Sequence, residues 1–348
     1  MLKVANIWPK LDFSDVLIQP KISETKLTRG DIDLEVDYGF FKGVPIVITE
    51  MVSTGTYKMA RALQGTDCVV FIHKEHTVEE HLKNLFELED LSKIGLSTGC
   101  GEGDIEKLFK VLPHVPDLGF VNIHIANTYA NVEGLCSLIK RLKKDFPEVA
   151  VSAGVVATPD ITKILCEAGA DIIRVGVGSG SACKTRSEVG IGVPQLSALL
   201  ECSEVAREHG CKVLSCGGVT NAGDVAKAMG AGADFVILGG MVSKCKECDN
   251  IVEVDGKEYV NFYGLGSAKQ YSKHGISQKE YRPDEGRNLL IPVEGSVHDV
   301  LNQVKGGLRS TCTYVGVPRL QELYDAVTFI KVNHQINTTL AKYEDSSA

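Results

Sequence analysis

The stretch of the sequence with the clearest chemical potential is a glycine-rich loop that ends in a cysteine. Residues 176–186 read Gly-Val-Gly-Ser-Gly-Ser-Ala-Cys-Lys-Thr-Arg. Glycine adopts backbone conformations that are closed to other residues, and it lets a ligand approach the main chain closely. Cys183 is followed by Lys184 and Arg186, and neighbouring cations favour the thiolate form of a cysteine. The pattern is typical of a cysteine nucleophile, and the alternative is an incidental thiol on a flexible surface loop.

Two glycine pairs, Gly217-Gly218 and Gly239-Gly240, follow consecutive apolar runs further along the chain. Either pair alone would more often mark a tight turn. Backbone N–H groups at such turns also bind phosphate. Because the pairs follow neighbouring strands, we expect them to form a phosphate site together with Ser181.

Apolar runs rich in Val and Ile recur along the chain and predict eight strands. Continuous rather than alternating hydrophobicity marks strands that are covered on both faces, as in a parallel sheet. We expect strands at Val44–Thr49, Val69–Lys74, Ile94–Thr98, Phe120–Ala126, Val149–Val156, Ile172–Val177, Lys212–Cys216 and Phe235–Gly239. Helical periodicity between them predicts helices that include Val78–Leu91, Val132–Lys144, Ile161–Ala168, Gln195–His209 and Ala222–Met229.

This alternation predicts an α/β fold, a (β/α)8 TIM barrel that takes residues 1–348 as a single domain. A doubly wound open sheet is the structural alternative. Seven of the eight runs have Gly, Ser, Thr, His, Asn or Cys within a few positions of their carboxyl ends, at the face where barrel enzymes build their sites. Two stretches exceed the repeat, Gly176–Pro194 and Cys245–Val293. The second is expected to hold a mobile flap, about residues 245–293, with a β-hairpin at Ile251–Phe262 around Asp255-Gly256.

Charge and composition exclude several kinds of partner. The net charge is −8 over 348 residues, and no Lys/Arg-rich run stands out, so we expect no nucleic-acid partner. The first 13 residues lack a long apolar segment, and no stretch is long enough to span a bilayer. We therefore expect no membrane partner and a cytoplasmic protein. A small anionic ligand remains compatible with this charge, because glycine loops and helix ends bind phosphate locally.

Eleven cysteines in a chain of this kind do not predict a disulfide framework. Cys245 and Cys248 form one C-x-x-C, but no second pair follows at zinc spacing, which favours a polar surface excursion over a metal site. We expect most of the others to be small buried apolar residues, for example Cys68, Cys136, Cys166 and Cys202.

The cysteine loop resembles the G-x-G-P-G-S-x-C-x-T-R loop of the IMP dehydrogenase and GMP reductase family. Further matches to that family follow in the same order along nearly the whole chain, from about Asp12 to Asn337. They include Asp12-Phe13-Ser14-Asp15-Val16-Leu17, Gly190-Ile191-Gly192-Val193-Pro194-Gln195, Gly232-Ala233-Asp234, Gly239-Gly240-Met241 and residues 306–316. Residues 281–286, Tyr-Arg-Pro-Asp-Glu-Gly, are similar to the Y-R-x-x-E-G of the reductase branch. The chain also has no room for the regulatory repeats that the dehydrogenases usually carry.

The resemblance implies an NADPH-dependent oxidoreductase that removes the 2-amino group of a purine nucleotide, GMP or dGMP. Cys183 would attack purine C2, while Thr185 and Glu285 would act as acid/base partners for the departing ammonia. The cofactor would then supply a hydride. An IMP dehydrogenase-like enzyme and a non-catalytic nucleotide-binding relative are the alternatives. For Glu285 by itself, a solvated flap carboxylate would be the simpler interpretation.

The same resemblance implies binding roles for other residues. Substrate contacts would come from Ser181, Cys216, Gly217, Gly218, Gly239, Gly240, Gly264, Leu265, Gly266, Arg282, Asp284 and Gly286. Cofactor contacts would come from Lys74, His124, Asn127, Ser310 and Tyr314. A potassium ion would be held by the carbonyl groups of Gly178 and Gly180. Relatives are usually homotetramers, and we expect the same here.

The chain departs from the family pattern at several positions in and around the expected site. Ser179 replaces a proline in the cysteine loop, and His124 stands first where relatives show D-x-A-N. Relatives show M-D-T-V and G-N-V where residues 51–54 read Met-Val-Ser-Thr and residues 154–156 read Gly-Val-Val. Cys216 replaces the aspartate of S-D-G-G, whose carboxylate would accept hydrogen bonds from both ribose hydroxyls. Because a thiol is a poor acceptor, the substrate is expected to lack the 2′-hydroxyl, or else the site has lost turnover.

Overall fold

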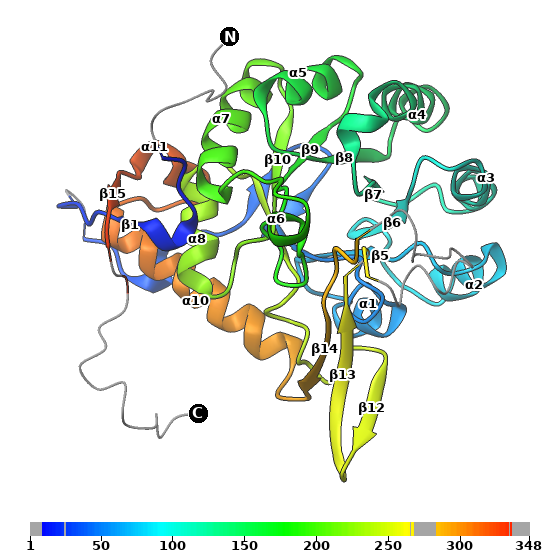
Figure 1. Cartoon of the computed structure of the whole chain (residues 1–348). Coiled ribbons are helices and arrows are strands. Elements are labelled where there is room, and N and C mark those ends of the chain that lie inside the picture. Colours follow the sequence, from blue (N-terminus) through cyan, green and yellow to red (C-terminus); the bar gives the residue numbers. More distant parts are fainter. Residues whose placement is uncertain (1–8, 24–25, 265, 268–282, 334, 336–348) are drawn as a thin grey trace.

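Eight parallel strands form a closed barrel at the centre of the molecule (Figure 1). The structure is a computed structural model that describes residues 9–23, 26–264, 266–267, 283–333 and 335. Around the barrel the strands follow the order β10-β11-β4-β5-β6-β7-β8-β9. Their bounds are β4 Ile46–Ile48, β5 Val69–Ile72, β6 Ile94–Thr98, β7 Phe120–His124, β8 Ala150–Val156, β9 Ile172–Val175, β10 Lys212–Cys216 and β11 Phe235–Leu238. The predicted (β/α)8 barrel is therefore confirmed, and the open sheet is excluded.

Each of the eight predicted runs contains one barrel strand. Several strands end earlier than predicted: β5 ends at Ile72 rather than Lys74, and β7 at His124 rather than Ala126. The residues beyond these points are polar or adjoin polar residues, and they lie outside the strand pairing, although the N–H of Ile125 still donates to the Gly154 carbonyl. They form the loops at the carboxyl ends of the strands.

Helices cover the outside of the barrel, as Figure 1 shows. Their bounds are α1 Tyr57–Ala62, α2 Val78–Leu85, α3 Glu102–Val111, α4 Val132–Asp145, α5 Pro159–Glu167, α7 Gln195–Glu208, α8 Ala222–Gly230, α10 Val297–Val315 and α11 Leu323–Ala326. The short helix α6, Thr185–Glu188, belongs instead to the loop after β9, at one end of the barrel. In α4 the buried residues Leu135, Leu138, Ile139 and Leu142 recur at helical spacing, which gives the helix one apolar face toward the barrel.

Helix α2 begins where the sequence predicts and ends six residues earlier. It starts with a capping box, in which Thr77 and Glu80 each accept the other's backbone N–H. The prediction ran to Leu91, but the N–H groups of Glu89 and Asp90 donate to the side chain of Gln64 rather than to helix carbonyls. The Gln64 side chain, which lies outside the helix, thus takes the place of the carbonyl acceptors that a longer helix would have supplied.

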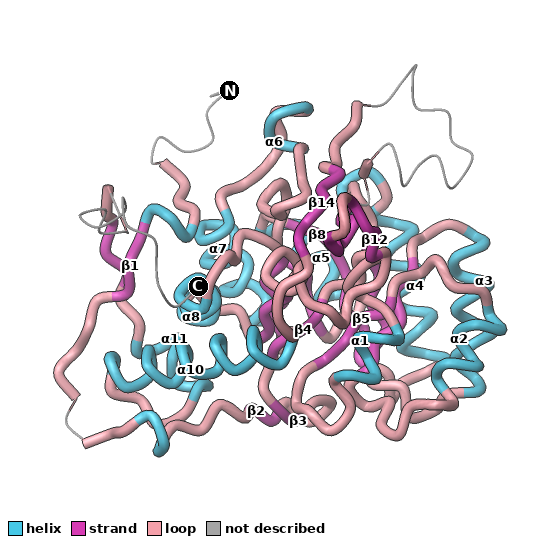
Figure 2. Tube along the Cα trace, turned by 90° about the horizontal axis from the view of Figure 1, so that it is seen from below, coloured by secondary structure: helices cyan, strands magenta, loops and turns pink. Residues whose placement is uncertain are grey.

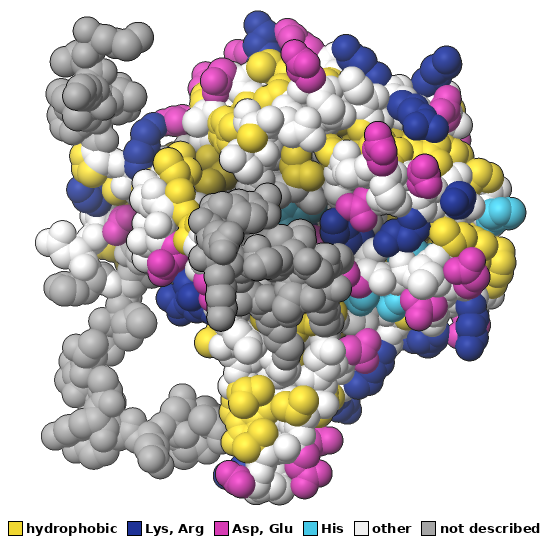
Figure 3. Space-filling view, turned by 45° about the vertical axis from the view of Figure 1, so that its right-hand side comes forward, with side chains coloured by type: hydrophobic (Ala, Val, Ile, Leu, Met, Phe, Trp, Pro, Cys, Tyr) yellow, Lys and Arg dark blue, Asp and Glu magenta, His cyan; other side chains and the backbone are white. Residues whose placement is uncertain are grey.

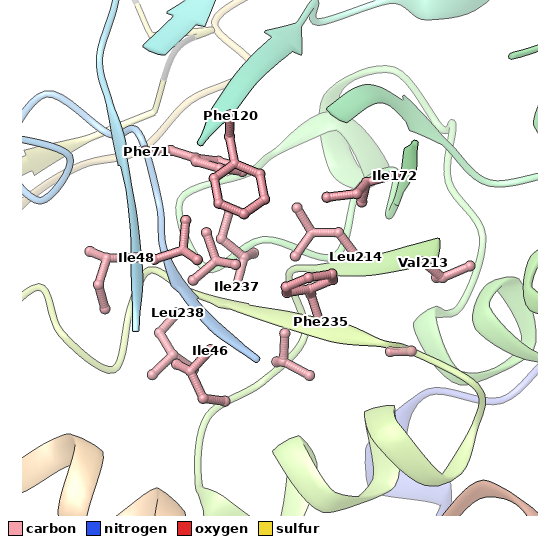
Figure 4. Close-up of a cluster of buried hydrophobic side chains, with 14 of the residues drawn as sticks. Ile46, Ile48, Phe71, Phe120, Ile172, Val213, Leu214, Phe235, Ile237 and Leu238 are labelled. Carbon is pink, nitrogen blue, oxygen red and sulfur yellow. The ribbon is translucent and has the colours of Figure 1, made fainter. Parts of the chain in front are cut away.

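Large apolar side chains fill the barrel interior. Phe71, Phe120 and Phe235 project into the same space (Figure 4), and each is almost completely buried. The short hairpin of β2 (Val36–Asp37) and β3 (Lys42–Gly43) carries Phe41, whose ring lies 5.1 Å from that of Phe235. In Figure 2 this hairpin and α6 lie at opposite edges of the molecule. One end of the barrel is therefore plugged by aromatic rings, and the site loops occupy the other.

Three further strand groups surround the barrel. β1 (Val16–Ile18) pairs with β15 (Phe329–Lys331), and β12 (Ile251–Val254), β13 (Lys257–Tyr263) and β14 (Asn288–Pro292) form an antiparallel sheet. The predicted hairpin is confirmed: Asp255 and Gly256 both have positive φ, 51° and 73°, as a type I′ turn requires. Figure 3 shows apolar side chains gathered on the projecting end of this sheet. They include Val252, Val254 and Leu290, which are exposed.

The prediction that Cys245 and Cys248 lie on the surface is wrong, because both side chains are fully buried. Burial raises the pKa of each thiol to about 12. Cys68, Cys166 and Cys202 are buried as expected, while Cys136 is half-buried. Within the described ranges, no group of three or more His, Cys, Asp or Glu side chains is arranged to hold a metal ion. None of the helices in the described part of the chain has the length and apolar composition needed to cross a bilayer.

We predict that Phe120→Ala destabilises the protein by about 3–5 kcal/mol, because it removes the side chain and leaves a cavity that the barrel cannot fill. Urea unfolding measures this change. Phe86→Ala is the matched control, since the ring of Phe86 is 66% exposed. Equal unfolding midpoints for the two variants would contradict the assignment of Phe120 to the barrel core.

Candidate active site

A cavity of about 370 Å³ opens at the carboxyl ends of the barrel strands. Its wall is built from the loops after β4, β7, β9, β10 and β11, together with Phe262, Gly264, Gly266, Glu285 and Gly286. The structure brings sixteen sequence-predicted residues into this wall: Cys183, Thr185, Glu285, Ser181, Cys216, Gly217, Gly218, Gly239, Gly240, Gly264, Gly266, Gly286, His124, Asn127, Gly178 and Gly180.

Cys183, Thr185 and Glu285 form a continuous hydrogen-bonded line. The thiol of Cys183 donates to Thr185 Oγ1 at 3.1 Å, and the Thr185 hydroxyl donates to Glu285 Oε2 at 2.8 Å. The backbone N–H of Thr185 also points at the cysteine sulfur, at 3.5 Å. This line can carry a proton from the sulfur to the carboxylate and back, which is the arrangement that an activated nucleophile requires.

Backbone hydrogen bonds hold Glu285 against the cysteine loop, although the two segments are a hundred residues apart. Cys183 and Gly286 form an antiparallel bridge. On either side of it, Lys184 N–H donates to the Glu285 carbonyl at 2.7 Å, and Arg287 N–H donates to the Ala182 carbonyl at 2.8 Å. Asp284 adds an ion pair to Lys184. Main-chain hydrogen bonds to the cysteine loop thus fix the backbone of Glu285 and bring its carboxylate next to Thr185.

The cysteine loop is fixed from below by Asp12 and Gln195. The Asp12 carboxylate accepts two hydrogen bonds from the guanidinium of Arg186 and one from the backbone N–H of Gln195. The fully buried side-chain amide of Gln195 donates to the Val175 carbonyl and accepts from the Ser179 hydroxyl. These contacts turn a glycine-rich segment into a defined loop.

The glycine pairs and Ser181 meet at one corner of the cavity. A Cβ placed on Gly240 would lie 2.8 Å from Ser181 Oγ, and one on Gly217 would lie 2.6 Å from Ser179 Oγ. Gly217 also has a φ of 92°, a conformation that other residues rarely adopt. The N–H of Gly218 is already engaged, because it donates to the Ser179 carbonyl at 2.9 Å. The corner fits a phosphate through Ser181 and the neighbouring main chain.

A charged cluster in the cavity wall contains two residues that the sequence analysis missed, Glu50 and Arg174. Arg174 Nη1 lies 2.9 Å from Glu50 Oε1, and His124 Nδ1 also contacts this oxygen. Both partners in the ion pair are at most 3% exposed. A charged residue in the apolar run Ile-Ile-Arg-Val of β9 was the available signal, since a buried arginine needs a counter-charge.

The cluster also sets the protonation states around it. Burial opposes ionisation of Glu50, but Arg174 and His124 outweigh it and hold the pKa of Glu50 well below its usual range. Burial, reinforced by Arg174, lowers the pKa of His124 despite the nearby Glu50. Burial raises the pKa of the Cys216 thiol, although Arg174 acts against it. At neutral pH the cluster therefore holds one positive charge, one negative charge, a neutral imidazole and a neutral thiol.

Several predicted binding residues lie elsewhere. Lys74 forms an ion pair with Asp104 at 2.6 Å and does not line the cavity. Ser310 and Tyr314 lie on α10, where Ser310 accepts a hydrogen bond from Arg29 and Tyr314 is exposed. Within the chain neither is brought to the cavity. Leu265 and Arg282 fall outside the described residues.

The proposed cation ligands are only partly suited to an ion. The carbonyl of Gly180 accepts the N–H of Cys183 at 3.0 Å and so closes a turn of the loop. Gly178 has a φ of 81°, and a Cβ there would collide with Arg186. The geometry explains both glycines through the loop itself, and no chemical step is derived through a cation.

Comparison with known proteins gives a consistent relationship over the whole chain. Residues 10–338 match the family model described as IMP dehydrogenase / GMP reductase domain. A GMP reductase of Onchocerca volvulus is 40% identical over 349 aligned residues, which cover 97% of this chain and 95% of that protein. A GMP reductase of Vibrio atlanticus is 40% identical over 342 residues, covering 96% and 98%. GMP reductase 1 of Homo sapiens is 41% identical over 344 residues, covering 95% and 98%.

We predict that iodoacetamide modifies Cys183 before Cys216, although both line the cavity. The reason is that burial raises the pKa of the Cys216 thiol and so disfavours its reactive thiolate. Mass spectrometry of peptides from a time course measures the order of modification. Cys202, whose pKa burial raises to about 11, is the internal control and should stay unmodified. Modification of Cys216 first would contradict the proposed protonation state of the cluster.

Proposed function

Because the chain belongs to the IMP dehydrogenase and GMP reductase family, we propose that it is a guanylate reductase, an oxidoreductase that converts a guanine nucleotide to the inosine nucleotide and ammonia. The observation that carries this proposal is the line from Cys183 through Thr185 to Glu285. It combines a thiol that can attack purine C2 with a carboxylate that can accept a proton and return it to the departing amine. The similarity to proteins named GMP reductase supports the reductase over the dehydrogenase.

The first half of the reaction uses only residues of this chain. Cys183 forms a carbon–sulfur bond to C2 of the purine, and the thiol proton passes through the Thr185 hydroxyl to Glu285. Glu285 then returns the proton by the same path to the 2-amino group. The carbon–nitrogen bond breaks, and neutral ammonia leaves. The balance of this half is one thiol and one guanine nucleotide giving one covalent adduct and one ammonia.

The second half is a reduction of the covalent adduct. NADPH, when bound, supplies a hydride to C2. Cleavage of the carbon–sulfur bond then releases the inosine nucleotide, and the sulfur takes up one proton from solvent, either directly or passed along Glu285 and Thr185. Glu285 thus serves as base when the thiol attacks and as acid when ammonia leaves.

The shape of the cavity supports a second ligand beside the nucleotide. Beyond Cys183 the wall continues to the end of β7, where Ala126, Asn127 and Tyr129 line it. Asn127 is held in place because its Oδ1 accepts the N–H of Ala130. His124 and Asn127 would contact the nicotinamide end of the cofactor. Contacts from Lys74, Ser310 and Tyr314 stay predictions, as does the choice of NADPH over NADH.

For the nucleotide, we assign the phosphate to the corner of Ser181, Gly217 and Gly240. The sugar would then lie along the wall between this corner and Cys183, which includes Cys216. A thiol is a weak acceptor, so we propose that dGMP is a substrate and is preferred over GMP. Gly264 and Gly266 would contact the purine side. Asp284 forms an ion pair with Lys184 and does not line the cavity, so its contact with the substrate stays a prediction.

Three further predictions complete the proposed enzyme. The exposed apolar side chains Val252, Val254 and Leu290 on the projecting sheet support self-association, and we propose a homotetramer. We also propose a cytoplasmic location, and a potassium ion at Gly178 and Gly180 stays a prediction.

We predict that the protein oxidises NADPH, followed by the absorbance at 340 nm, when dGMP or GMP is added at matched concentration, and that dGMP is turned over faster. Ammonia release and mass spectrometry of the product check the chemistry. Faster turnover of GMP would keep the reductase and discard the deoxyribose argument. Silence with both nucleotides would contradict the reductase. NAD-dependent formation of a xanthosine nucleotide would instead identify a dehydrogenase.

We predict that Thr185→Val lowers kcat by roughly 10²- to 10⁴-fold, because it breaks the proton path between Cys183 and Glu285. Thr185→Ser keeps the hydroxyl and is the matched control, with activity close to that of the unmodified protein. Iodoacetamide labelling of Cys183 in the valine variant checks that the loop remains intact. Full activity of Thr185→Val would exclude the proposed relay.

A further inference from the structure

Two departures from the family pattern that lie far apart in the sequence meet at one place in the structure. His124 ends β7 and Cys216 ends β10, and relatives show an aspartate at each position. In the structure both side chains adjoin the ion pair of Arg174 and Glu50. Together these four residues form the charged cluster of the cavity wall. The two substitutions therefore belong to one arrangement.

Both carboxylate oxygens of the charged cluster face donors within the protein. Glu50 Oε1 faces both Arg174 and His124, and Glu50 Oε2 accepts the Thr49 hydroxyl at 3.3 Å. The guanidinium of Arg174 also donates to Asn122 Oδ1 at 3.2 Å. Its Nε finds no hydrogen-bond acceptor among the described residues. The carboxylate therefore offers a nucleotide no oxygen that is free of contacts within the cluster, and the remaining acceptor is the second ring nitrogen of the neutral His124.

The charge of the cluster is balanced before any substrate binds. Arg174 contributes one positive charge and Glu50 one negative charge, while the imidazole and the thiol are neutral. An aspartate at position 216 would place a second carboxylate against the same guanidinium, inside a wall where both existing partners are buried. Such a carboxylate would be costly unless Glu50 lost its charge.

The sugar of a bound nucleotide would face this acceptor-poor wall. A ribose brings two hydroxyl donors to it, and a 2′-deoxyribose brings one. A buried hydroxyl without an acceptor is unfavourable, whereas a methylene group in the same place needs no partner. The wall is therefore expected to weaken the binding of a nucleotide that carries a 2′-hydroxyl, rather than to bind both sugars equally well.

We propose that Glu50 is a specificity-determining residue. By supplying the counter-charge of Arg174 from β4, it allows an uncharged residue at position 216 and so selects 2′-deoxyribonucleotides. This inference rests on the proposed function. Glu50 does not touch the reacting atoms, and its effect on the sugar acts through Arg174 and position 216.

A set of four proteins tests the proposal: the unmodified chain, Cys216→Asp, Glu50→Gln and the double variant. The kcat/KM ratio of dGMP to GMP is measured for each. We expect the double variant to shift this ratio toward GMP by roughly 10- to 100-fold, because one carboxylate now faces the sugar. Cys216→Asp alone should shift it much less, since two carboxylates then share Arg174. Glu50→Gln alone should lower activity with both nucleotides and leave the ratio unchanged.

Two results would overturn the proposal. If Cys216→Asp alone gave the full shift, Glu50 would play no part in selectivity. If all four proteins showed one ratio, the cluster would not read the sugar. Controls are Glu294→Gln, which removes one partner of the exposed pair with Lys244, and Cys136→Asp on α4, since neither residue lines the cavity.

A binding measurement on the unmodified chain keeps the proposal testable if a variant does not fold. Calorimetric titration compares GMP, dGMP and 2′,3′-dideoxyGMP without cofactor. We expect dGMP to bind about tenfold or more tightly than GMP, and the dideoxy analogue to bind at least as tightly as dGMP. Tighter binding of GMP would reject the acceptor-poor wall. Because no turnover is needed, this result is independent of the proposed reductase activity, which would fail by silence in the NADPH assay.

Discussion

The ion pair between Arg174 and Glu50 constrains much of the site around it. An arginine inside a barrel strand cannot be left unpaired, and breaking a buried pair by removing one partner typically costs about 3–5 kcal/mol. Glu50 meets this need from the end of β4, three strands around the barrel from β9. Once that pair is in place, the residues next to it can only be neutral. His124 and Cys216 satisfy this condition, one because burial lowers its pKa and the other because burial raises it.

The site combines the rigid apolar core of the barrel with loop segments that hydrogen bonds fix above it. Phe120 and the other aromatic rings fill the lower barrel, and the polar residues Asn122 and Arg174 form the transition to the cavity. Above them, the loop with Cys183 is held by Asp12 and Gln195. Cys183, the proposed nucleophile, therefore lies on a loop that is held by Asp12, by Gln195 and by main-chain hydrogen bonds to residues 285–287. Such support is what a catalytic loop requires in order to keep reacting groups in register.

Much of the fold could be predicted from the sequence, because each barrel strand lies in a continuous apolar run. Such a run is typical of a strand that is covered on both faces. The loop of Cys183 could be singled out because glycine spacing and an adjacent cysteine carry a local signal, and the structure places this loop in the cavity wall. The role of Cys183 as a nucleophile stays a proposal. Glu50 and Arg174 could not be assigned together, since their pairing depends on how β4 and β9 lie across a closed barrel. The burial of Cys245 and Cys248 was also hidden, because a segment rich in charged residues can still turn its thiols inward. The early end of α2 depended on Gln64, which lies outside the helix.

The main-chain pairing of Cys183 with Gly286 is expected to be less stable than the barrel beneath it. The barrel is held by closed strands and a continuous apolar core, whereas Glu285 is held to the nucleophile by a few main-chain hydrogen bonds near the surface. Local opening of such a segment costs far less than global unfolding. Heating would therefore separate Glu285, the proposed acid, from Cys183 while the barrel stays folded, and we expect activity to be lost reversibly below the melting temperature of the protein. The pairing between residues 182–184 and 285–287, rather than the barrel core, would then set the upper temperature at which the enzyme works.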